Sequence, residues 1–297
     1  MAPRGNSIVN LLALLMTWSL AVSAQEVIDD DGNTVTLDRP AQRIISLAPS
    51  LTELTFSAGA GDRLIGVIEY SDYPPAALEL PRIGRHDMLD LERILTLKPD
   101  LILAWRSGNP RASVEKLRQL GLTVYMAEPR DLQSISSNLE RIGSLAGTGT
   151  IARARSTQFR AELAKLRSRY HDAATVRTFY QVWNDPLITA GGNELTNDII
   201  SLCGGANIFA DVRQIAPKVS TEAILSRRPE VIIGSGLAAE RPAWLDDWRR
   251  WQTLPAVERN NLFSIPPAEL QRQTLRVLTG SRQICEFLEI ARKRRQP

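Results

Sequence analysis

Three aromatic side chains stand where apolar runs of the sequence end and polar loops begin. Tyr70 and Trp105 each come within two residues of the end of such a run, and Trp183 closes a third. Ligands of open α/β sheets bind beyond the carboxyl ends of the strands, and flat rings there suit a large flat ligand because stacking adds contact area at a low ordering cost. The alternative is that each ring only packs against the protein. That alternative is stronger for four other aromatics: Tyr73, Trp244, Trp248 and Trp251.

A twelve-residue segment that begins at Glu92 recurs about 130 positions later, beginning at Glu222. Each Glu stands two residues after a helix-cap candidate, Asp90 or Ser220. A local explanation is therefore available, because a carboxylate in the first turn interacts favourably with the helix dipole by about 0.3–1 kcal/mol. Recurrence at the same place in both copies favours a second interpretation, a matched pair of surface charges that a two-lobed partner recognises.

The sequence contains few sets of residues that could form a catalytic site. The two histidines, His86 and His171, have no metal-ligand spacing, which excludes zinc sites of the usual kind. No glycine-rich loop has the Walker or dinucleotide pattern, and Gly191–Gly192 and Gly204–Gly205 are better read as turns and a helix stop. We expect no enzymatic activity, no metal site and no cofactor. A secreted α/β hydrolase is the alternative class, and the lack of a nucleophile with a nearby histidine argues against it.

The N-terminus has the pattern of a secretory signal peptide. Arg4 supplies a positive charge, an apolar stretch follows from Ile8 to Ala21, and Val22–Ala24 is a small-x-small cleavage site. We predict that residues 1–24 are removed and that the mature chain starts at Gln25. An uncleaved anchor is the alternative, but the stretch is shorter than the roughly 20 residues that span a bilayer.

The charge distribution does not favour nucleic acid as a partner. The formal net charge is +3, and the basic residues form no long block apart from residues 292–295 at the C-terminus. That cluster is most simply a cationic end to the last helix, where it interacts favourably with the helix dipole.

The chain has two cysteines, Cys203 and Cys285. Because an exported protein meets an oxidising compartment, we expect them to be bonded to each other, with two buried free thiols as the alternative. The bond would tie the start of the second half to the final helix. In the chain-entropy model it contributes roughly 4 kcal/mol to stability.

The repeated segment also predicts the fold. In each copy a short apolar helix is stopped by a Pro, and the aliphatic run that follows reads as a strand buried on both faces, hence part of a parallel sheet. Helix and strand patterns alternate on either side of each copy, which is typical of doubly wound α/β structure. Residues 26–38 read as a small hairpin, and Ser50 with Glu53 reads as a capping box that starts the first helix.

The segment from Thr148, a cap candidate, to about His171 has helical periodicity and no breaker. It lies between the two copies of the repeat and reads as a stiff connector, roughly 36 Å long. We therefore predict an α/β protein with two doubly wound lobes, parallel sheets, one long joining helix and a ligand cleft between the lobes. The predicted parts are the N-terminal lobe 25–147, the inter-lobe helix 148–172 and the C-terminal lobe 173–297.

Several motifs resemble the ABC-transporter substrate-binding proteins that have a single rigid inter-lobe helix. The resemblance covers essentially the whole mature chain, and two of its motifs, Tyr70–Pro75 and Ala104–Arg106, are more specific to the branch that binds cobalamin. Among the other motifs, Arg43–Glu53 and Cys203–Phe209 occur widely, including in haem and ferric-siderophore receptors. These other motifs are Arg43–Glu53, Leu91–Ile94, Leu97–Asp100, Cys203–Phe209 and Val219–Glu222.

The resemblance implies a soluble periplasmic receptor, present as a monomer, that captures cobalamin or a related corrinoid and delivers it to the membrane permease subunits of an ABC importer. It implies that Tyr70 and Trp105 contact the corrin and that Arg272 contacts its edge. It also implies that Glu92 and Glu222 pair with arginines of the two permease subunits. Last, it implies the disulfide between the two cysteines, Cys203 and Cys285.

The chain departs from the cobalamin pattern at three places. His86 and Ala216 stand where the pattern has tryptophans, and Ala268 beside Glu269 stands where it has an aspartate. We include His86, Trp183 and Glu269 among the ligand-binding candidates. His86 can be a solvated hydrogen-bonding residue or can offer a nitrogen to the metal of a bound ligand. A haem or ferric-siderophore receptor of the same fold is the alternative function.

Overall fold

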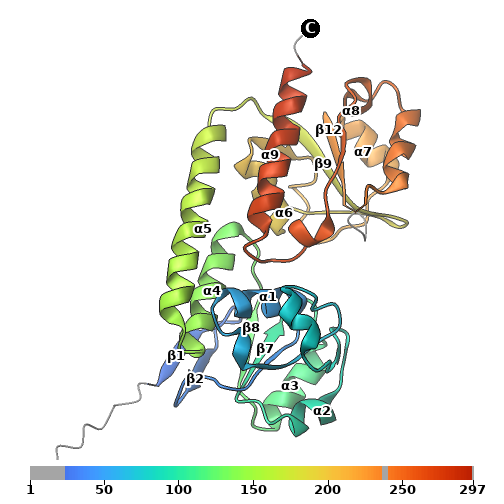
Figure 1. Cartoon of the computed structure of the whole chain (residues 1–297). Helices are drawn as coiled ribbons and strands as arrows, with labels where there is room; N and C mark the ends of the chain where they lie inside the picture. The colour runs from blue at the N-terminus through green and yellow to red at the C-terminus, as the bar shows by residue number, and fades with distance from the viewer. Residues whose placement is uncertain (1–23, 236–239, 296–297) are drawn as a thin grey trace, which may run out of the picture.

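The computed structural model describes residues 24–235 and 240–295, so all of the predicted signal peptide except Ala24 lies outside the described residues. Two α/β lobes stand one above the other, and a long helix, α5, runs beside both (Figure 1). The predicted two-lobed α/β fold is therefore confirmed. Within the described ranges no helix is both long enough and apolar enough to span a bilayer.

The first lobe contains a four-stranded parallel sheet in the order β4-β3-β7-β8. Alternate residues of β7 enter separate apolar clusters, Leu101 and Leu103 on one face and Ile102 and Ala104 on the other. The sheet is thus buried on both faces, as the aliphatic run predicted. The bounds in the sheet are β3 Ile44–Ser46, β4 Leu64–Val67, β7 Leu101–Trp105 and β8 Val124–Ala127. The helices are α1 Pro49–Ser57, α2 Leu91–Thr96, α3 Arg111–Gln119 and α4 Leu132–Leu145.

Smaller elements complete the first lobe. The predicted hairpin is present as β1 and β2, and a second short hairpin, β5–β6, carries His86 at its turn. The bounds are β1 Gln25–Ile28, β2 Thr34–Leu37, β5 Gly84–Arg85 and β6 Met88–Leu89, with 3-10 turns at Gly61–Arg63 and Pro75–Glu79.

The second lobe is built on the sheet β10-β9-β12-β13, with β11 also paired to β9. All of its pairings are parallel except that of β10, which returns antiparallel along β9. The strands are β9 Val176–Asn184, β10 Leu187–Thr189, β11 Gly205–Asn207, β12 Val231–Gly234 and β13 Leu262–Ser264. The helices are α6 Leu195–Leu202, α7 Thr221–Arg227, α8 Pro255–Glu258 and α9 Val277–Lys293, with 3-10 segments at Ala243–Arg250 and Pro267–Glu269.

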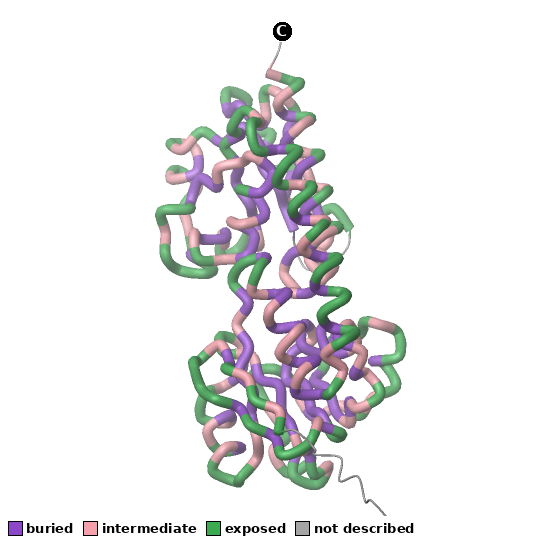
Figure 2. The backbone as a smooth tube through the Cα atoms, turned by 90° about the vertical axis from the view of Figure 1, so that its left-hand side faces the viewer, coloured by how far each residue is buried: buried purple, intermediate pink, exposed green. Residues whose placement is uncertain are grey.

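The joining helix α5 spans Gly149–Tyr170. Thr148 occupies its N-cap position, but the Thr148 side chain makes no capping hydrogen bond and donates instead to the Gly143 carbonyl. One apolar cluster is continuous from the first sheet through α4 and α5 to the second sheet, and it includes Leu103, Phe159 and Ile233. Buried backbone runs through the interior of both lobes (Figure 2). The lobes are therefore joined by shared packing along the helices as well as by the chain.

The capping box predicted from Ser50 and Glu53 is wrong. Helix α1 begins at Pro49 after Ala48, and no side chain caps it. Proline is well suited to the first helical position because its missing N–H has no partner there in any case. The Glu53 side chain is only 2% exposed and makes ion pairs with the other lobe.

Cys203, which directly follows α6, is bonded to Cys285 of α9. The predicted disulfide is confirmed, and the described residues include no free cysteine. The final helix, α9, starts at Val277. The preceding residues form an irregular segment that carries Arg272 and Arg276.

Candidate ligand-binding site and docking residues

Tyr70 lies in the loop that follows β4. Its side chain is 71% exposed, and its backbone has a left-handed φ of 64°. The next residue, Ser71, is buried and accepts a hydrogen bond from the Thr52 hydroxyl of α1, at 3.1 Å. The loop is thus fastened at Ser71, while the Tyr70 ring stays available for contact with a ligand.

Trp105, the last residue of β7, is half-buried and lies close to His86. The two ring centroids are 6.2 Å apart and the ring planes are inclined by 44°. The buried Asn109 side chain holds this arrangement. Its oxygen accepts from the backbone N–H of Trp105 at 2.6 Å. Its amide nitrogen donates to the backbone carbonyls of Leu47 at 2.9 Å and His86 at 3.1 Å.

Asn109 is a site-supporting residue that sequence reasoning missed. The available signal was an amide residue four positions after a strand-end aromatic and directly before Pro110. Such a position is typical of a turn whose side chain bonds nearby backbone groups. Nothing local indicated that the same side chain also reaches Leu47, the residue after β3, and the β5–β6 hairpin.

Arg272 of the second lobe contacts the Tyr70 loop directly. It donates to the Tyr70 carbonyl at 3.1 Å and to Glu53 at 2.9 Å, and it forms an ion pair with Asp72. The Arg272 hydrogen bond keeps the pKa of the Asp72 carboxyl below its ordinary value. Two residues predicted to bind ligand, Tyr70 and Arg272, therefore meet from opposite lobes.

The structure does not connect Trp183 and Glu269 to the other ligand-binding candidates. The Trp183 indole donates to the Asp185 carbonyl at 2.9 Å, and the Glu269 carboxylate accepts from Gln283 at 2.7 Å. Both side chains are half-buried. In the part of the chain that the structure describes, no hydrogen bond, ion pair or ring contact links either residue to Tyr70, Trp105 or Arg272.

The three other tryptophans of the described ranges follow the packing alternative. Trp248 is buried edge-on against Phe179 in the second-lobe core, and Trp244 and Trp251 pack against the same cluster. Tyr73 differs from them because it is exposed and lies under the Arg276 guanidinium, 4.2 Å from the ring centroid.

Glu92 and Glu222 are exposed at matched places, each the second residue of its helix, α2 or α7. Figure 1 shows α2 in the first lobe and α7 in the second. The predicted caps are present: Asp90 accepts from the Arg93 N–H at 3.0 Å, and Ser220 accepts from the Ala223 N–H at 3.2 Å. Hydrogen bonds from its own backbone N–H and from Ser220 lower the pKa of Glu222, so this carboxylate is charged at neutral pH.

The sequence from residue 44 to residue 269 matches the periplasmic binding protein family, and this range includes both sheets. The chain belongs to this family.

Among curated relatives, the vitamin B12-binding protein of Vibrio cholerae is 42% identical over 255 residues, which cover 86% of this chain and 91% of the relative. The vitamin B12-binding protein of Yersinia pestis is 38% identical over 246 residues, which cover 83% of this chain and 86% of the relative. The solved structure of the periplasmic vitamin B12-binding protein of Vibrio cholerae is 41% identical, with a TM-score of 0.79, and the match covers 86% of this chain and 99% of that one.

Periplasmic haem-binding proteins share the fold of this periplasmic binding protein. One from Roseiflexus has a TM-score of 0.72 at 22% identity, covering 84% of this chain and 99% of that one. At that identity the likeness shows the fold alone. The family has a binding role, and no group of three or more His, Cys, Asp or Glu residues in the described ranges could hold a metal ion.

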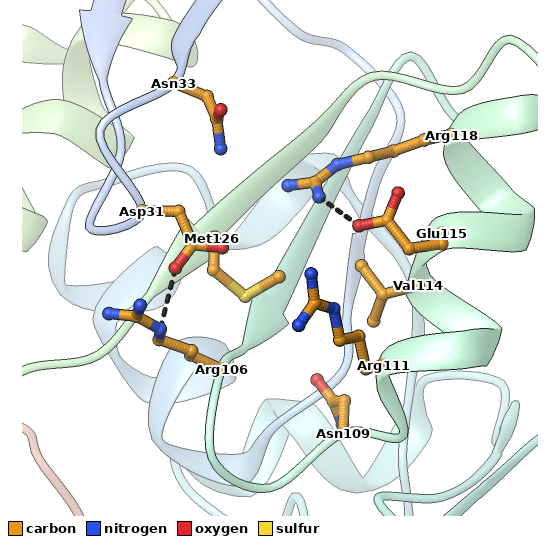
Figure 3. A pocket seen from close by; sticks show the side chains of 9 residues that line it. All are labelled: Asp31, Asn33, Arg106, Asn109, Arg111, Val114, Glu115, Arg118 and Met126. Carbon is orange, nitrogen blue, oxygen red and sulfur yellow. Dashed lines mark hydrogen bonds and ion pairs between the residues drawn. The ribbon is translucent and has the colours of Figure 1, made fainter.

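A separate hollow of about 490 Å³ lies on the first lobe of this periplasmic binding protein, between the β1–β2 hairpin, β8 and α3 (Figure 3). Most of its lining is charged. Arg106 pairs with Asp31 at 2.8 Å and Arg118 with Glu115 at 2.8 Å, while Arg111 points between these pairs. None of the residues predicted to bind ligand lines it. A flat ligand with much apolar area suits the exposed Tyr70 ring and the half-buried Trp105 ring better than this charged hollow.

Proposed function

We propose that this protein captures cobalamin, or a related corrinoid, and delivers it to an ABC importer. One observation carries the proposal. The Tyr70 loop of the first lobe meets Arg272 of the second, in a chain that is 42% identical to a vitamin B12-binding protein over most of both lengths. The rings provide flat contact area, and the Nε–H of the Arg272 guanidinium provides a hydrogen-bond donor for a polar group at the edge of the ligand.

Each candidate has a role in this proposal. Tyr70 and Trp105 lie against the corrin, with His86 beside Trp105, and Arg272 binds the edge of the ligand. Trp183 and Glu269 contribute from the second lobe. The protein performs no chemistry on the ligand and holds no cofactor or metal of its own.

The mature protein acts in the periplasm as a soluble monomer, after cleavage behind Ala24. The Cys203–Cys285 disulfide supports this location because such bonds persist in oxidising compartments. The working units are the N-terminal lobe 25–147, the connecting helix 148–172 and the C-terminal lobe 173–297. No nucleic acid is involved.

Delivery uses Glu92 and Glu222 as docking residues for arginines on two permease subunits. The equivalence of their positions supports this role. Both glutamates are exposed, and each is the second residue of a capped helix in the repeated part of the sequence. Charge complementarity of this kind orients partners and speeds their encounter.

Isothermal titration of the mature protein with cyanocobalamin tests the proposal, with haemin as the parallel ligand. We expect one-to-one cobalamin binding and no comparable haemin signal. Haemin binding without cobalamin binding would move the protein to the haem branch of the fold, and Tyr70 and His86 would then be tested as iron ligands.

A further inference from the structure

Four charged side chains meet between the lobes, and we call them the inter-lobe charge cluster: Glu53 and Asp72 from the first lobe, and Arg272 and Arg276 from the second. Glu53 is the centre of the cluster. One of its oxygens accepts from Arg272 at 2.9 Å and from Arg276 at 2.7 Å, and the other accepts from Arg276 at 2.9 Å. Arg276 thus binds Glu53 with two parallel hydrogen bonds, the strong geometry for an arginine and a carboxylate.

The burial of Glu53 makes these bonds obligatory. At 2% exposure its charge has lost its water, and a buried carboxylate is tolerated only when it is paired and hydrogen-bonded. Both cationic partners come from residues more than 200 positions away, in the irregular segment before α9. Arg276 is held on its other side by the Tyr73 ring, 4.2 Å from the centroid, through a cation–π contact.

The cluster is a second attachment between the lobes. The first is the continuous apolar cluster through α4 and α5, where the Leu132 N–H also donates to Asp198 and Arg282 pairs with Glu162 of α5. The inter-lobe charge cluster instead reaches the carbonyl of Tyr70, so it borders the predicted ligand contacts. Two attachments at different places oppose rotation of one lobe against the other more strongly than the apolar cluster does alone.

We propose that Glu53 is the positioning residue that sets the separation of the lobes. By holding the segment of Arg272 and Arg276 against α1, it places Arg272 opposite Tyr70 and keeps Glu92 and Glu222 at a nearly constant distance. The effect on lobe separation stands by itself, while the effect on corrinoid affinity rests on the proposed function.

Distance measurements between spin labels on the two lobes test the inference without any ligand. Thr96 and Ser226 occupy matched exposed positions near the ends of α2 and α7, so Thr96→Cys and Ser226→Cys place one label on each lobe. The parent protein should show one narrow distance distribution. Glu53→Gln should broaden it or shift it, because neutral Gln takes the carboxylate away from Arg276 and leaves Arg272 with Asp72 alone.

Glu115→Gln is the matched control, since Glu115 pairs with Arg118 inside the first lobe, and it should leave the distribution unchanged. Arg276→Gln is a second test variant, to be used if the Glu53 variant does not fold. It removes the two parallel hydrogen bonds to Glu53 and keeps the Glu53–Arg272 pair. Circular dichroism and thermal melting establish that each variant is folded. Folded Glu53 and Arg276 variants with the parent distribution would overturn the proposal.

Cyanocobalamin titration of the same proteins adds the ligand readout. We expect Glu53→Gln and Arg276→Gln to weaken binding roughly tenfold, because pre-organisation of the two lobes is lost, with Glu115→Gln unchanged. If the parent protein does not bind cobalamin, the proposed function fails and the distances still decide the role of Glu53. If the parent binds and the distances do not respond, the role of Glu53 fails and the function stands.

Discussion

Arg272 has three oxygen-bearing partners, and all of them belong to the first lobe. Glu53, Asp72 and the Tyr70 carbonyl engage its two terminal nitrogens, Nη1 and Nη2. An arginine has five N–H donors, and the Nε–H of Arg272 has no partner among the described residues. A residue predicted only as a ligand contact therefore also joins the lobes, and the Nε–H is the donor that remains for a ligand.

Tyr70→Ala should weaken cyanocobalamin binding about ten- to a hundredfold, from the loss of about 1.5–3 kcal/mol of ring burial. Titration calorimetry measures the loss. Tyr70→Phe is the control, and we expect it to keep most of the affinity because it keeps the ring. Since the Tyr70 side chain is 71% exposed, neither change should alter the melting temperature by more than a few degrees. Unchanged affinity in Tyr70→Ala would remove Tyr70 from the site.

At the scale of elements, the two repeated segments are built on the same contacts. Lys98 and Arg228 both have left-handed φ values, 46° and 45°, directly before a Pro. The acid that follows each Pro accepts a hydrogen bond from the backbone at the start of a strand in its own sheet: Asp100 from the Arg43 N–H just before β3, at 2.9 Å, and Glu230 from the Arg177 N–H of β9, at 3.0 Å. Each repeated segment is therefore fastened to its own sheet by an equivalent hydrogen bond.

The double substitution Glu92→Lys and Glu222→Lys should abolish binding to the importer and leave corrinoid affinity intact. Both glutamates are exposed, and neither contacts Tyr70, Trp105 or Arg272. Co-purification with the importer in lipid nanodiscs and cobalamin titration give the two readouts. Glu79→Lys with Glu286→Lys changes the net charge equally at other exposed places and should keep importer binding. A parallel loss of ligand affinity would contradict the docking role.

Glu230 should make the second lobe sensitive to acid. Burial, the largest single influence, raises the pKa of Glu230, but the hydrogen bonds from the Arg177 N–H and from Arg295 outweigh it, so the pKa is lowered overall. A carboxyl with a lowered folded-state pKa stabilises the protein above its unfolded value of about 4.3, and this stability is lost as the pH falls through the folded value.

Glu230→Gln should therefore lower the free energy of unfolding by about 1.5–3 kcal/mol at pH 7, the usual range for hydrogen bonds to a charged group. Urea unfolding at pH 7 and at pH 3.5 measures it, and the gap between variant and parent should narrow at the lower pH. Glu286→Gln, an exposed change on α9, is the control. A gap of equal size at both pH values would contradict the account.

The rigidity of the whole molecule depends on contacts between segments that are distant in the sequence. The shared apolar cluster and α5 join the lobes on one side, the inter-lobe charge cluster joins them near Tyr70, and the disulfide ties α6 to α9 across 82 positions. Such an arrangement favours a receptor that binds with small changes of shape, because each lobe moves only if several contacts break together.

Replacing both cysteines, Cys203→Ser with Cys285→Ser, should lower the free energy of unfolding by about 4 kcal/mol, from the extra entropy of an unfolded chain without the cross-link. Denaturant titration of the variant, beside the parent with and without a reductant, measures the loss. The reduced parent should behave like the variant. A loss below 1 kcal/mol would mean that the bond adds little beyond the packing around it.

The sequence alone determined the features that depend on neighbouring residues. The repeat beginning at Glu92 and Glu222 predicted two lobes, Asp90 and Ser220 predicted helix starts, and the unbroken pattern from Thr148 predicted the joining helix. Each of these rests on periodicity, capping or a Pro, and such forces act within a few positions of the chain. The cysteine pair was also within reach, because only one intramolecular pairing of two residues exists.

Only the tertiary structure decided what Glu53, Asn109 and Arg272 contact. Ser50 and Glu53 have the spacing of a capping box, so local reasoning assigned Glu53 to its own helix, whereas its partner Arg276 lies 223 positions away. The physical reason is the same in each case. A buried charge or amide takes whichever partners the packed lobes bring within hydrogen-bonding distance, and chain order does not encode that distance.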